Sequence, residues 1–442
     1  MAEQQVGNRD YPVHGPAKRI RFPSARVGEC VRLMTTRVYH PGLNQTRSIS
    51  NVLVPRTEDD YSSDSSSDDS MEDIGQGEEK EQRAYWLQRT LMEAIYGRVC
   101  IATVLRRRRR PADGETPHTY ENENEPFVEW EITRERCAIK EMLWEGIRQR
   151  RRELAEDPIE EINAMQFMVN SLLPQEVQVN PETLQNTMRE CHVLLPIDVI
   201  QDERYLYSIM PYCNGGDMFG LLDESTKFNE PQARYWIRQI LQGLQTLQYM
   251  GVCHRDMSLE NVLFHDESCY IMDFGMCFRV PFTNIPVDST DFFPPDTRGE
   301  RQLVVPSGTM GKWNYMSPEI ARNREPFDGF AIDLWAVGVM LFTMVTGMHP
   351  WDKPDRVIDR FRYMTGGYLV QILTEWNLGL TPALMDLLQK MLWFYPNDRL
   401  SLEQVLEHPW MQGEVQAPTP RPPWFNHWQS KDSNVNVIKA IS

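Results

Sequence analysis

The chain has few cysteines, and none of them is arranged as zinc ligands or disulfide partners usually are. Its eight cysteines are scattered over 442 residues, and no two of them stand in CxxC spacing. This excludes the common zinc motifs and a disulfide framework. We therefore expect reduced thiols and a cytoplasmic location, with the nucleus as an alternative.

Long apolar segments are also missing. The N-terminal sequence MAEQQVGNRD has no apolar core of the kind that a secretory signal requires. The longest apolar run, residues 334–345, is too short to span a bilayer. We predict that it forms a buried helix, and we expect no membrane partner.

Positive charge is scarce. The chain has 46 Lys and Arg residues against 63 Asp and Glu residues, which gives a net charge of -17. This balance argues against a nucleic-acid partner. Residues 58–81 alone contain eleven acidic residues and one lysine, among many serines. We therefore predict that residues 1–84 form a disordered, acidic and Ser-rich N-terminal region.

Residues 254–275 carry the clearest chemical pattern in the chain. Asp256 is followed by Asn261 and then by Asp273 at the start of Asp-Phe-Gly. Two short apolar runs around a polar turn separate Asn261 from Asp273, and they predict a hairpin that brings these two side chains together. An Asp that orients a hydroxyl, with an Asn and an Asp that hold metal, suits phosphoryl transfer from a nucleotide.

This stretch resembles the catalytic and metal-binding loops of the eukaryotic protein kinases of Ser/Thr type. The resemblance covers residues 85–412 and implies an α+β, bilobal fold. A small antiparallel β lobe with one main helix would span residues 85–212, and a large, mostly helical lobe residues 213–412. Residues 413–442 would be a Pro-rich C-terminal tail.

The resemblance assigns the catalytic and metal-binding roles. Asp256 would accept the proton of the substrate hydroxyl, and Asn261 and Asp273 would bind Mg²⁺. Lys140 closes a Cys-Ala-Ile-Lys sequence that matches the Val-Ala-Ile-Lys strand of the family. It would position the phosphates of ATP, and Glu161, in a helical pattern 21 residues later, would hold it.

The glycine-rich loop of the family is present in degraded form. Residues 91–104 predict two strands around a turn, in which Gly97 and Val99 match the third glycine and the valine. Met92 and Ala94 stand where the first two glycines belong. Glycines at these positions let backbone amides approach phosphate, so we expect their loss to loosen nucleotide binding.

Residues 205–213 predict a strand that leads into the hinge of the family. Met210 matches the gatekeeper position. Pro211 keeps the carbonyl that adenine requires, and Cys213 would offer the amide. Asp217 would reach the ribose. Two further predicted nucleotide-binding residues are Ala138 and Leu263.

The chain departs from the family at two positions. Most Ser/Thr kinases have a Lys two residues after the catalytic Asp, where this chain has Ser258, and a Thr in the substrate-docking loop, where it has Lys312. We hypothesise that Lys312 reaches across to Asp256 and supplies the missing ammonium group, with Ser258 as its hydroxyl partner. The alternative is that Ser258 weakens the enzyme while Lys312 faces solvent.

The activation segment of the family corresponds to residues 273–319, with a Pro-rich and acidic middle that we expect to be mobile. Arg255 precedes the catalytic Asp, which in the family often means that a nearby phosphate or acid organises this segment. Ser307 and Thr309 are therefore candidate sites for an upstream kinase.

Three residues of the predicted large lobe match supporting positions of the family. Asp333 would cap backbone groups of the catalytic loop, and Arg399 would pair with Glu319. These matches favour a protein substrate and oppose a third possibility, a small-molecule kinase of related fold. The main competing hypothesis is a pseudokinase that binds nucleotide or partners without efficient catalysis.

Two acidic residues bear on the substrate. Asp217 and Glu260 match positions that read arginines in kinases of basic substrates, so we predict protein substrates with basic residues before the target. The arginines at residues 106–110 leave several interpretations open. They could form a nuclear signal, an anionic docking site, a partner for the acidic region, or a solvated loop.

Overall fold

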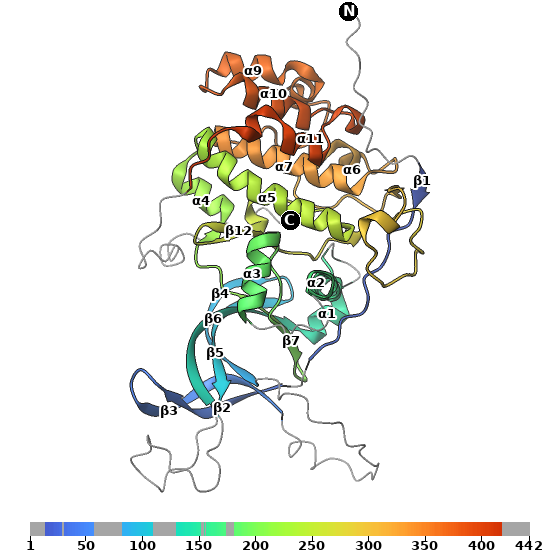
Figure 1. Ribbon diagram of the computed structural model, residues 1–442. Coiled ribbons are helices and arrows are strands. Elements are labelled where there is room, and N and C mark those ends of the chain that lie inside the picture. The colour runs from blue at the N-terminus through green and yellow to red at the C-terminus, as the bar shows by residue number, and fades with distance from the viewer. Residues whose placement is uncertain are drawn as a thin grey trace, which may run out of the picture. The chain divides into compact units, whose positions relative to one another are not determined.

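The computed structural model describes residues 14–28, 31–56, 82–108, 130–151, 154, 156–173 and 181–417. The chain divides into two compact units. The β unit comprises residues 26–151 and 196–212, and the helical unit comprises residues 1–25, 152–195 and 213–442. A strand-rich unit and a helix-rich unit confirm the predicted α+β fold class (Figure 1).

A seven-stranded sheet in the order β2-β3-β4-β5-β6-β8-β7 forms the β unit. Neighbouring strands are antiparallel, and an additional parallel pairing of β2 with β6 closes the first five strands into a ring. The elements are β2 (Val31–His40), β3 (Gln45–Pro55), β4 (Arg83–Ala94), β5 (Gly97–Arg107), β6 (Trp130–Leu143), α1 (Trp144–Arg150), β7 (Asp198–Gln201) and β8 (Tyr205–Pro211).

The hairpin of β2 and β3 corrects one expectation. We predicted a disordered region up to residue 84, but residues 31–55 form two long paired strands. Val38 and Val52 are fully buried in a cluster with Trp130 and Leu105. The partners that bury this hairpin lie far along the chain, so its own sequence, rich in Arg and Thr, does not show where its apolar side chains pack.

Side chains of the arginine run contact the β unit itself. Arg106 pairs with Glu135, and Arg107 donates to Gln82. The Arg108 guanidinium lies 4.4 Å from the centre of the Tyr39 ring. These three contacts favour a structural role for the first part of the run. Residues 109 and 110 lie outside the described residues.

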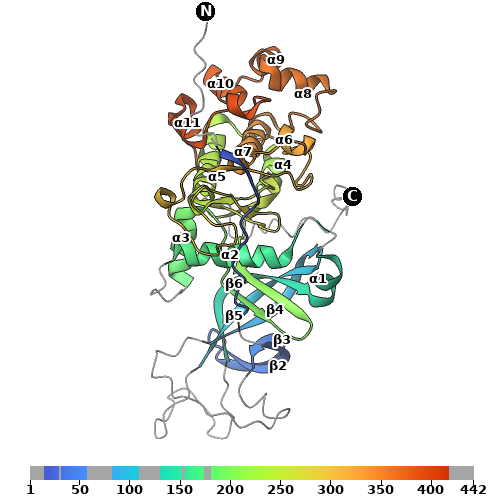
Figure 2. The same ribbon diagram turned by 90° about the vertical axis from the view of Figure 1, so that its right-hand side faces the viewer.

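Helices dominate the other unit, with α5 and α7 packed against each other at its centre (Figures 1 and 2). The helices are α2 (Pro158–Leu172), α3 (Pro181–Cys191), α4 (Met218–Ser225), α5 (Glu230–Met250), α6 (Pro318–Arg322), α7 (Gly329–Thr346), α8 (Asp359–Tyr363), α9 (Leu369–Trp376), α10 (Pro382–Met391) and α11 (Leu402–Glu407), with short turns η2 (Leu259–Asn261), η3 (Pro295–Thr297), η4 (Met364–Tyr368), η5 (Pro396–Asp398) and η6 (Pro409–Gln412).

Short strands complete the helical unit. They form the three-stranded sheet β12-β11-β9 and the pairs β10–β13 and β1–β14. The strands are β1 (His14–Ala17), β9 (Gly216–Asp217), β10 (Val252–Cys253), β11 (Val262–His265), β12 (Ser268–Ile271), β13 (Phe278–Arg279) and β14 (Gln302–Val304).

Helix α7 is the buried helix that the sequence predicts. Its 18 residues are long and apolar enough to cross a membrane, yet 94% of them are buried inside the unit. The Asp328 side chain caps its first turn, and Gly347 ends it with a left-handed φ of 76°. A helix that is apolar on all sides and buried on all sides belongs to the core of a large domain.

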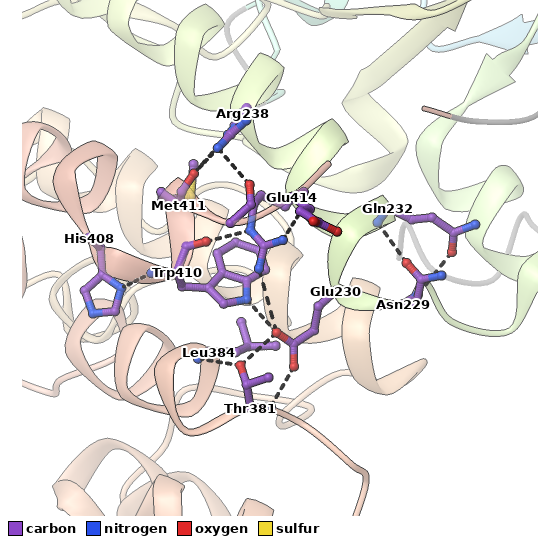
Figure 3. A network of polar contacts seen from close by, with 12 residues as sticks. Asn229, Glu230, Gln232, Arg238, Thr381, Leu384, His408, Trp410, Met411 and Glu414 are labelled. Atoms are coloured by element: carbon purple, nitrogen blue, oxygen red, sulfur yellow. Dashed lines mark hydrogen bonds and ion pairs between the residues drawn. The ribbon is translucent and has the colours of Figure 1, made fainter. Parts of the chain in front are cut away.

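The end of the described chain packs on α5 (Figure 3). Arg238 donates to the Met411 carbonyl, and the Trp410 indole donates to Glu230 at 2.7 Å. Glu230 also accepts from Thr381 before α10. The Gln416 amide donates to the Pro231 carbonyl, so the domain continues past residue 412. From residue 418 the predicted tail lies outside the described residues.

Candidate active site

The hairpin of β11 and β12 places two predicted metal ligands next to each other. Val262 pairs with Ile271, so Asn261 just before β11 lies beside the chain that leaves β12. The Met272 amide donates to the Asn261 carbonyl at 2.9 Å, and Asp273 follows directly. The predicted hairpin is confirmed, and its strand pairing brings Asn261 and Asp273 to the same end.

Asp333 of α7 holds the start of the catalytic loop. One carboxylate oxygen accepts from the His254 amide at 2.7 Å, and the other accepts from the Arg255 amide at 2.8 Å. Burial raises the pKa of Asp333, and His254 together with the two amide bonds opposes that rise. The predicted capping role of Asp333 is confirmed.

Two residues of the site adopt a backbone conformation that is unfavourable for side chains other than glycine. Arg255 has a φ of 70° and Asp273 a φ of 67°. His254 links the two loops, because its Nε2 lies 2.9 Å from the Met272 carbonyl while its Nδ1 accepts from the Asp256 amide. Burial lowers the pKa of His254, so a neutral ring with Nε2–H fits these bonds.

The Asp256 carboxylate is held from two sides. The Asn261 side-chain amide donates to Oδ2 at 2.9 Å, and the Lys312 backbone amide donates to Oδ1 at 3.1 Å. Burial raises the pKa of Asp256 to about 6, and the charge of Lys312 works against that rise while Asp273 adds to it. The carboxylate is therefore fixed in orientation as a proton acceptor must be.

Lys312 meets Ser258 as predicted. Its ammonium donates to the Ser258 hydroxyl at 2.6 Å and lies 3.4 Å from Asn261 Oδ1 and 3.8 Å from a Glu260 oxygen. The predicted partnership with Ser258 is confirmed. The predicted reach of the Lys312 ammonium to Asp256 is wrong: the backbone amide of Lys312 makes that contact, and its side chain turns toward Ser258 and Asn261.

Gly311 permits this close approach, and sequence reasoning missed it. It has a φ of 94°, and a Cβ atom there would lie 3.0 Å from the Arg255 carbonyl and 3.3 Å from Asp256 Oδ1. A pocket borders the same loop, and Asp256, Lys312 and Tyr315 are among the residues that line it. The spacing from Glu319 located Lys312, but no local signal marked the glycine before it.

Arg255 reaches the activation segment. Its guanidinium donates to the Ser307 hydroxyl at 3.3 Å and to the Gly308 carbonyl at 2.9 Å. Its Nε and Nη1 atoms are buried without a hydrogen-bond partner, and burial lowers its pKa to about 10. Thr309, the other candidate phosphosite, is exposed.

The middle of the activation segment follows a path of turns and short elements, and its predicted mobility stays a prediction. Two buried arginines hold it by donating to backbone carbonyls. Arg279 donates to the Ser289 carbonyl at 2.9 Å, and Arg298 donates to the Phe293 carbonyl at 2.7 Å. Backbone carbonyls in this proline-rich stretch have few partners in helices or strands, and these arginine side chains supply hydrogen bonds to them instead.

Four predicted nucleotide-binding residues share one face of the β-unit sheet. Val99 pairs with Lys140, and Ala138 pairs with Met210, on the strands β5, β6 and β8. Because side chains alternate along a strand, all four point to the same face. Each of them is half-buried, whereas Ile139 on the opposite face is fully buried in the core.

The degraded glycine loop is the hairpin between β4 and β5. Ala94 pairs with Gly97 around a two-residue turn. A Cβ atom on Gly97 would lie 2.1 Å from the Glu141 carbonyl oxygen of β6, so strand packing alone requires this glycine. Met92 is 51% exposed. The predicted hairpin is confirmed, and its contact with a nucleotide stays a prediction.

The remaining predicted residues are divided between the units. Pro211 ends β8 in the β unit, and Cys213 is buried in the helical unit. Asp217 pairs with Leu263 across β9 and β11, and one Asp217 oxygen caps α4 by accepting from Gly220. Glu161 is buried in α2 of the helical unit, so its ion pair with Lys140 of the β unit stays a prediction.

The predicted pair of Glu319 and Arg399 is confirmed. Arg399 donates to both Glu319 oxygens, at 2.7 and 2.9 Å, and both side chains are nearly fully buried. Planar guanidinium and carboxylate groups form a strong bidentate ion pair in this geometry. The pair anchors α6, which follows the substrate-docking loop.

The donor atoms of the site fit a magnesium ion. The described residues contain no cluster of three or more His, Cys, Asp or Glu side chains that would hold a metal without further ligands. Asp273 and Asn261 instead offer one carboxylate and one amide oxygen. Mg²⁺ prefers such hard oxygen ligands and takes the rest of its ligands from phosphate and water.

Comparison with known proteins identifies the protein family to which the chain belongs. The family model of the protein kinase domain matches residues 170–411, more than half of the chain. The chain therefore belongs to the protein kinase family. The match begins beyond Gly97, Lys140 and Glu161, so these three assignments do not rest on it.

Curated relatives include kinases of animals and plants. The maternal embryonic leucine zipper kinases of Xenopus tropicalis and Xenopus laevis are 27% and 26% identical over 241 residues, which is 54% of this chain and 32% of each relative. The serine/threonine-protein kinase SAPK7 of Oryza sativa subsp. japonica is 25% identical over 254 residues, 57% of this chain and 65% of that protein. The chain thus matches less than two thirds of each relative's length.

Proposed function

We propose that this chain is an ATP-dependent protein serine/threonine kinase, which transfers the γ-phosphate of ATP to Ser and Thr hydroxyls of protein substrates. The observation that carries the proposal is the intact set of contacts around Asp256. Its carboxylate is oriented by Asn261 and Lys312, beside a pocket in the substrate-docking loop. In phosphoryl transfer the protein contributes mainly such positioning and electrostatic stabilisation.

In this proposal each side chain has a defined task. Asp256 accepts the proton of the substrate hydroxyl, and Asp273 and Asn261 Oδ1 would hold Mg²⁺. When bound, ATP supplies the phosphoryl group and the metal ions neutralise the charge that develops on it. Lys140, held by Glu161, positions the phosphates. The other nucleotide contacts are assigned to Gly97, Val99, Ala138, Met210, Pro211, Cys213, Asp217 and Leu263.

Lys312 takes the place of the missing catalytic-loop lysine. Its ammonium lies within hydrogen-bond distance of Ser258 Oγ and near Asn261 Oδ1, so it brings a positive charge to the metal-binding side of Asp256. We assign it the contact with the transferring phosphate, and Ser258 the role of its anchor. A charge-assisted contact at a transition state contributes roughly 10²–10³ in rate.

The substrate preference is proposed to be basic. The Glu260 side chain is 36% exposed, while its buried oxygen lies 3.8 Å from Lys312, which leaves the other oxygen for a substrate. Asp217 keeps one oxygen beyond the one that caps α4. We assign both carboxylates to arginines that precede the target residue. A peptide library that shows no enrichment for Arg or Lys upstream of the target would contradict this preference.

Regulation by an upstream kinase is proposed at Ser307. The unpaired Nε and Nη1 atoms of Arg255 offer donors for a phosphate on the neighbouring Ser307 hydroxyl, whereas exposed Thr309 is the second candidate. If Ser307→Ala left activation by cell extracts unchanged, Thr309 or no site would be regulatory.

A cytoplasmic location, with the nucleus as the alternative, is also proposed. The seven cysteines among the described residues are buried and unpaired, which suits a reducing compartment. Cell fractionation tests this location.

The competing function is a pseudokinase scaffold. Exposed Met92 in the degraded loop favours it, and so does the Lys312 ammonium near Asn261 Oδ1, where it competes with a metal ion. Both functions allow ATP to raise the melting temperature. They differ in turnover, because only the kinase transfers phosphate.

The test is Mg²⁺-dependent transfer of labelled phosphate from ATP to casein and to a mixture of basic peptides. The proposal expects labelled phosphoserine and phosphothreonine, before or after treatment with an upstream kinase. A protein that is stabilised by ATP but transfers no phosphate in either state would establish the scaffold instead.

A further inference from the structure

Residues 14–25 lie outside the part of the chain that matches the kinase family, yet they follow a defined path over the helical unit (Figure 2). The segment begins as β1, which pairs in parallel with β14 of the activation segment. His14 pairs with Gln302, and Ala17 pairs with Val304. The Val305 amide extends the ladder by donating to the Ala17 carbonyl at 3.2 Å.

The segment next crosses β13, near the start of the activation segment. The Ile20 amide donates to the Arg279 carbonyl at 3.1 Å, and the Ile20 side chain is only 2% exposed. The Arg279 guanidinium returns a bond to the Arg21 carbonyl. The same guanidinium also holds the middle of the activation segment through the Ser289 carbonyl, so one side chain joins both segments.

The segment then contacts α2. The Phe22 ring, 6% exposed, meets the Phe167 ring edge-on at a centroid distance of 5.6 Å. The Ala25 amide donates to the buried Asn163 side chain at 2.8 Å. Asn163 is two residues from Glu161, the proposed partner of Lys140. At its N-terminus α2 is tied to the metal-binding loop, since the Asp157 amide donates to the Gly275 carbonyl.

We propose that residues 14–25 are an intramolecular clamp that couples the activation segment to α2. Two short paired strands are not stable alone, so β1 stays paired with β14 only while Ile20 and Phe22 keep the segment in place. β14 itself has a second partner, because Val304 also exchanges backbone bonds with Phe327, and β1 adds to that anchor. Apolar burial at Ile20 and Phe22 and the bond at Asn163 fix it at three separated points. Release of the clamp would free both elements at once and misplace Glu161. The catalytic consequence rests on the proposed kinase function; the coupling itself does not.

The chain offers a matched set of variants for the test. Ile20→Asp and Phe22→Ala remove buried anchors, and Asn163→Ala removes the side-chain acceptor on α2 alone. Lys18→Ala and Ser24→Ala change exposed side chains of the same segment and serve as controls. The full-length proteins are first compared by circular dichroism, and Asn163→Ala is the mildest variant should an anchor variant fail to fold.

Hydrogen exchange of amides in α2 and β14 is the primary measurement. The clamp predicts that a change at Phe22, which packs on Phe167, or at Asn163, which accepts from Ala25, accelerates exchange in β14 by about tenfold, with the controls unchanged. Where transfer activity is measurable, it should fall by a similar factor. Altered exchange in a protein without activity would support the clamp and contradict the kinase proposal. Exchange in β14 that stays at the wild-type rate in folded Phe22→Ala and Asn163→Ala would overturn the clamp.

Discussion

The Lys312 ammonium lies 2.6 Å from the Ser258 hydroxyl, across the gap between the substrate-docking loop and the catalytic loop. In the family pattern that the sequence resembles, the lysine belongs to the catalytic loop and the hydroxyl to the docking loop. By that pattern the two groups have exchanged positions in this chain, and here they contact each other. The positive charge beside Asp256 is therefore retained although its position in the sequence has changed.

This exchange can be tested by mutation. Replacing Lys312 with Ala should lower the turnover number by roughly 10²–10³, because a charge at the transferring phosphate is lost. The double variant Ser258→Lys, Lys312→Thr restores the order of the family pattern that the sequence resembles and should recover most of the activity. Steady-state kinetics of the single and double variants check this. A turnover number unchanged in Lys312→Ala would show that the lysine is not catalytic.

Much of the site was predictable because it is local in sequence. Asp256, Asn261 and Asp273 lie within one loop and hairpin whose strand signals are strong, and Asp333 and Arg399 stand at recognisable spacings. The contact of Lys312 with Ser258 could be inferred from the exchange of residue types. Its exact hydrogen bonds could not, because the backbone path through Gly311 decides that the amide, and not the ammonium, meets Asp256.

The N-terminal part was not predictable in the same way. The cluster that buries Val38 and Val52 of the β2–β3 hairpin includes Leu105 and Trp130, which follow later in the chain. The clamp likewise buries Ile20 and Phe22 against partners more than a hundred residues away. Isolated apolar residues among polar ones give no periodic signal, so whether they are buried depends on partners that are distant in sequence.

The pair of Arg399 and Glu319 should be important for stability. Arg399→Met leaves a carboxylate buried without its partner, which costs about 3–5 kcal/mol of unfolding free energy. The exposed pair of Arg362 and Asp359 provides a control, and Arg362→Met should change that free energy by less than about 1 kcal/mol. Urea unfolding of the two variants measures the difference. Equal effects would mean that the buried pair is no stronger than a surface pair.

His192 predicts a pH dependence of stability. Burial lowers its pKa below the ordinary value of 6.5, and its Nδ1 lies 2.9 Å from the Cys269 carbonyl. The neutral ring is thus favoured in the folded state. Its contribution is complete above pH 6.5 and is lost as the pH falls below that value, by up to about 1.4 kcal/mol per pH unit until the folded state also binds the proton.

The variant His192→Asn removes this titration and tolerates the left-handed φ of 52° at this position. Unfolding free energies at pH 7.5 and 5.5 should therefore differ more in the wild type than in the variant. If the two proteins lost the same stability on acidification, His192 would have no part in it.

Gly97 and Gly146 of the β unit differ in the space around them: close packing requires a glycine at residue 97 but not at residue 146. A methyl group at Gly97 would meet the Glu141 backbone, whereas at Gly146 in helix α1 the nearest atom is 3.9 Å away. Gly97→Ala should destabilise the protein by about 1–3 kcal/mol. Gly146→Ala should stabilise it by about 0.4–1 kcal/mol, through the lower entropy of the unfolded chain. Thermal unfolding distinguishes the two, and a neutral Gly97→Ala would refute the packing argument.

The most direct test of the proposed function compares Asp256→Asn with Asp266→Asn. Both replace one carboxylate within the same loop and hairpin, but Asp266 lies in the exposed turn between β11 and β12. The measurement is the rate of Mg²⁺-dependent phosphate transfer from ATP to protein. Loss of a general base lowers rates by roughly 10²–10⁴, so Asp256→Asn should lose transfer by that factor while Asp266→Asn retains it. Transfer that persists in Asp256→Asn at the wild-type rate would contradict the assignment of Asp256 as the catalytic residue.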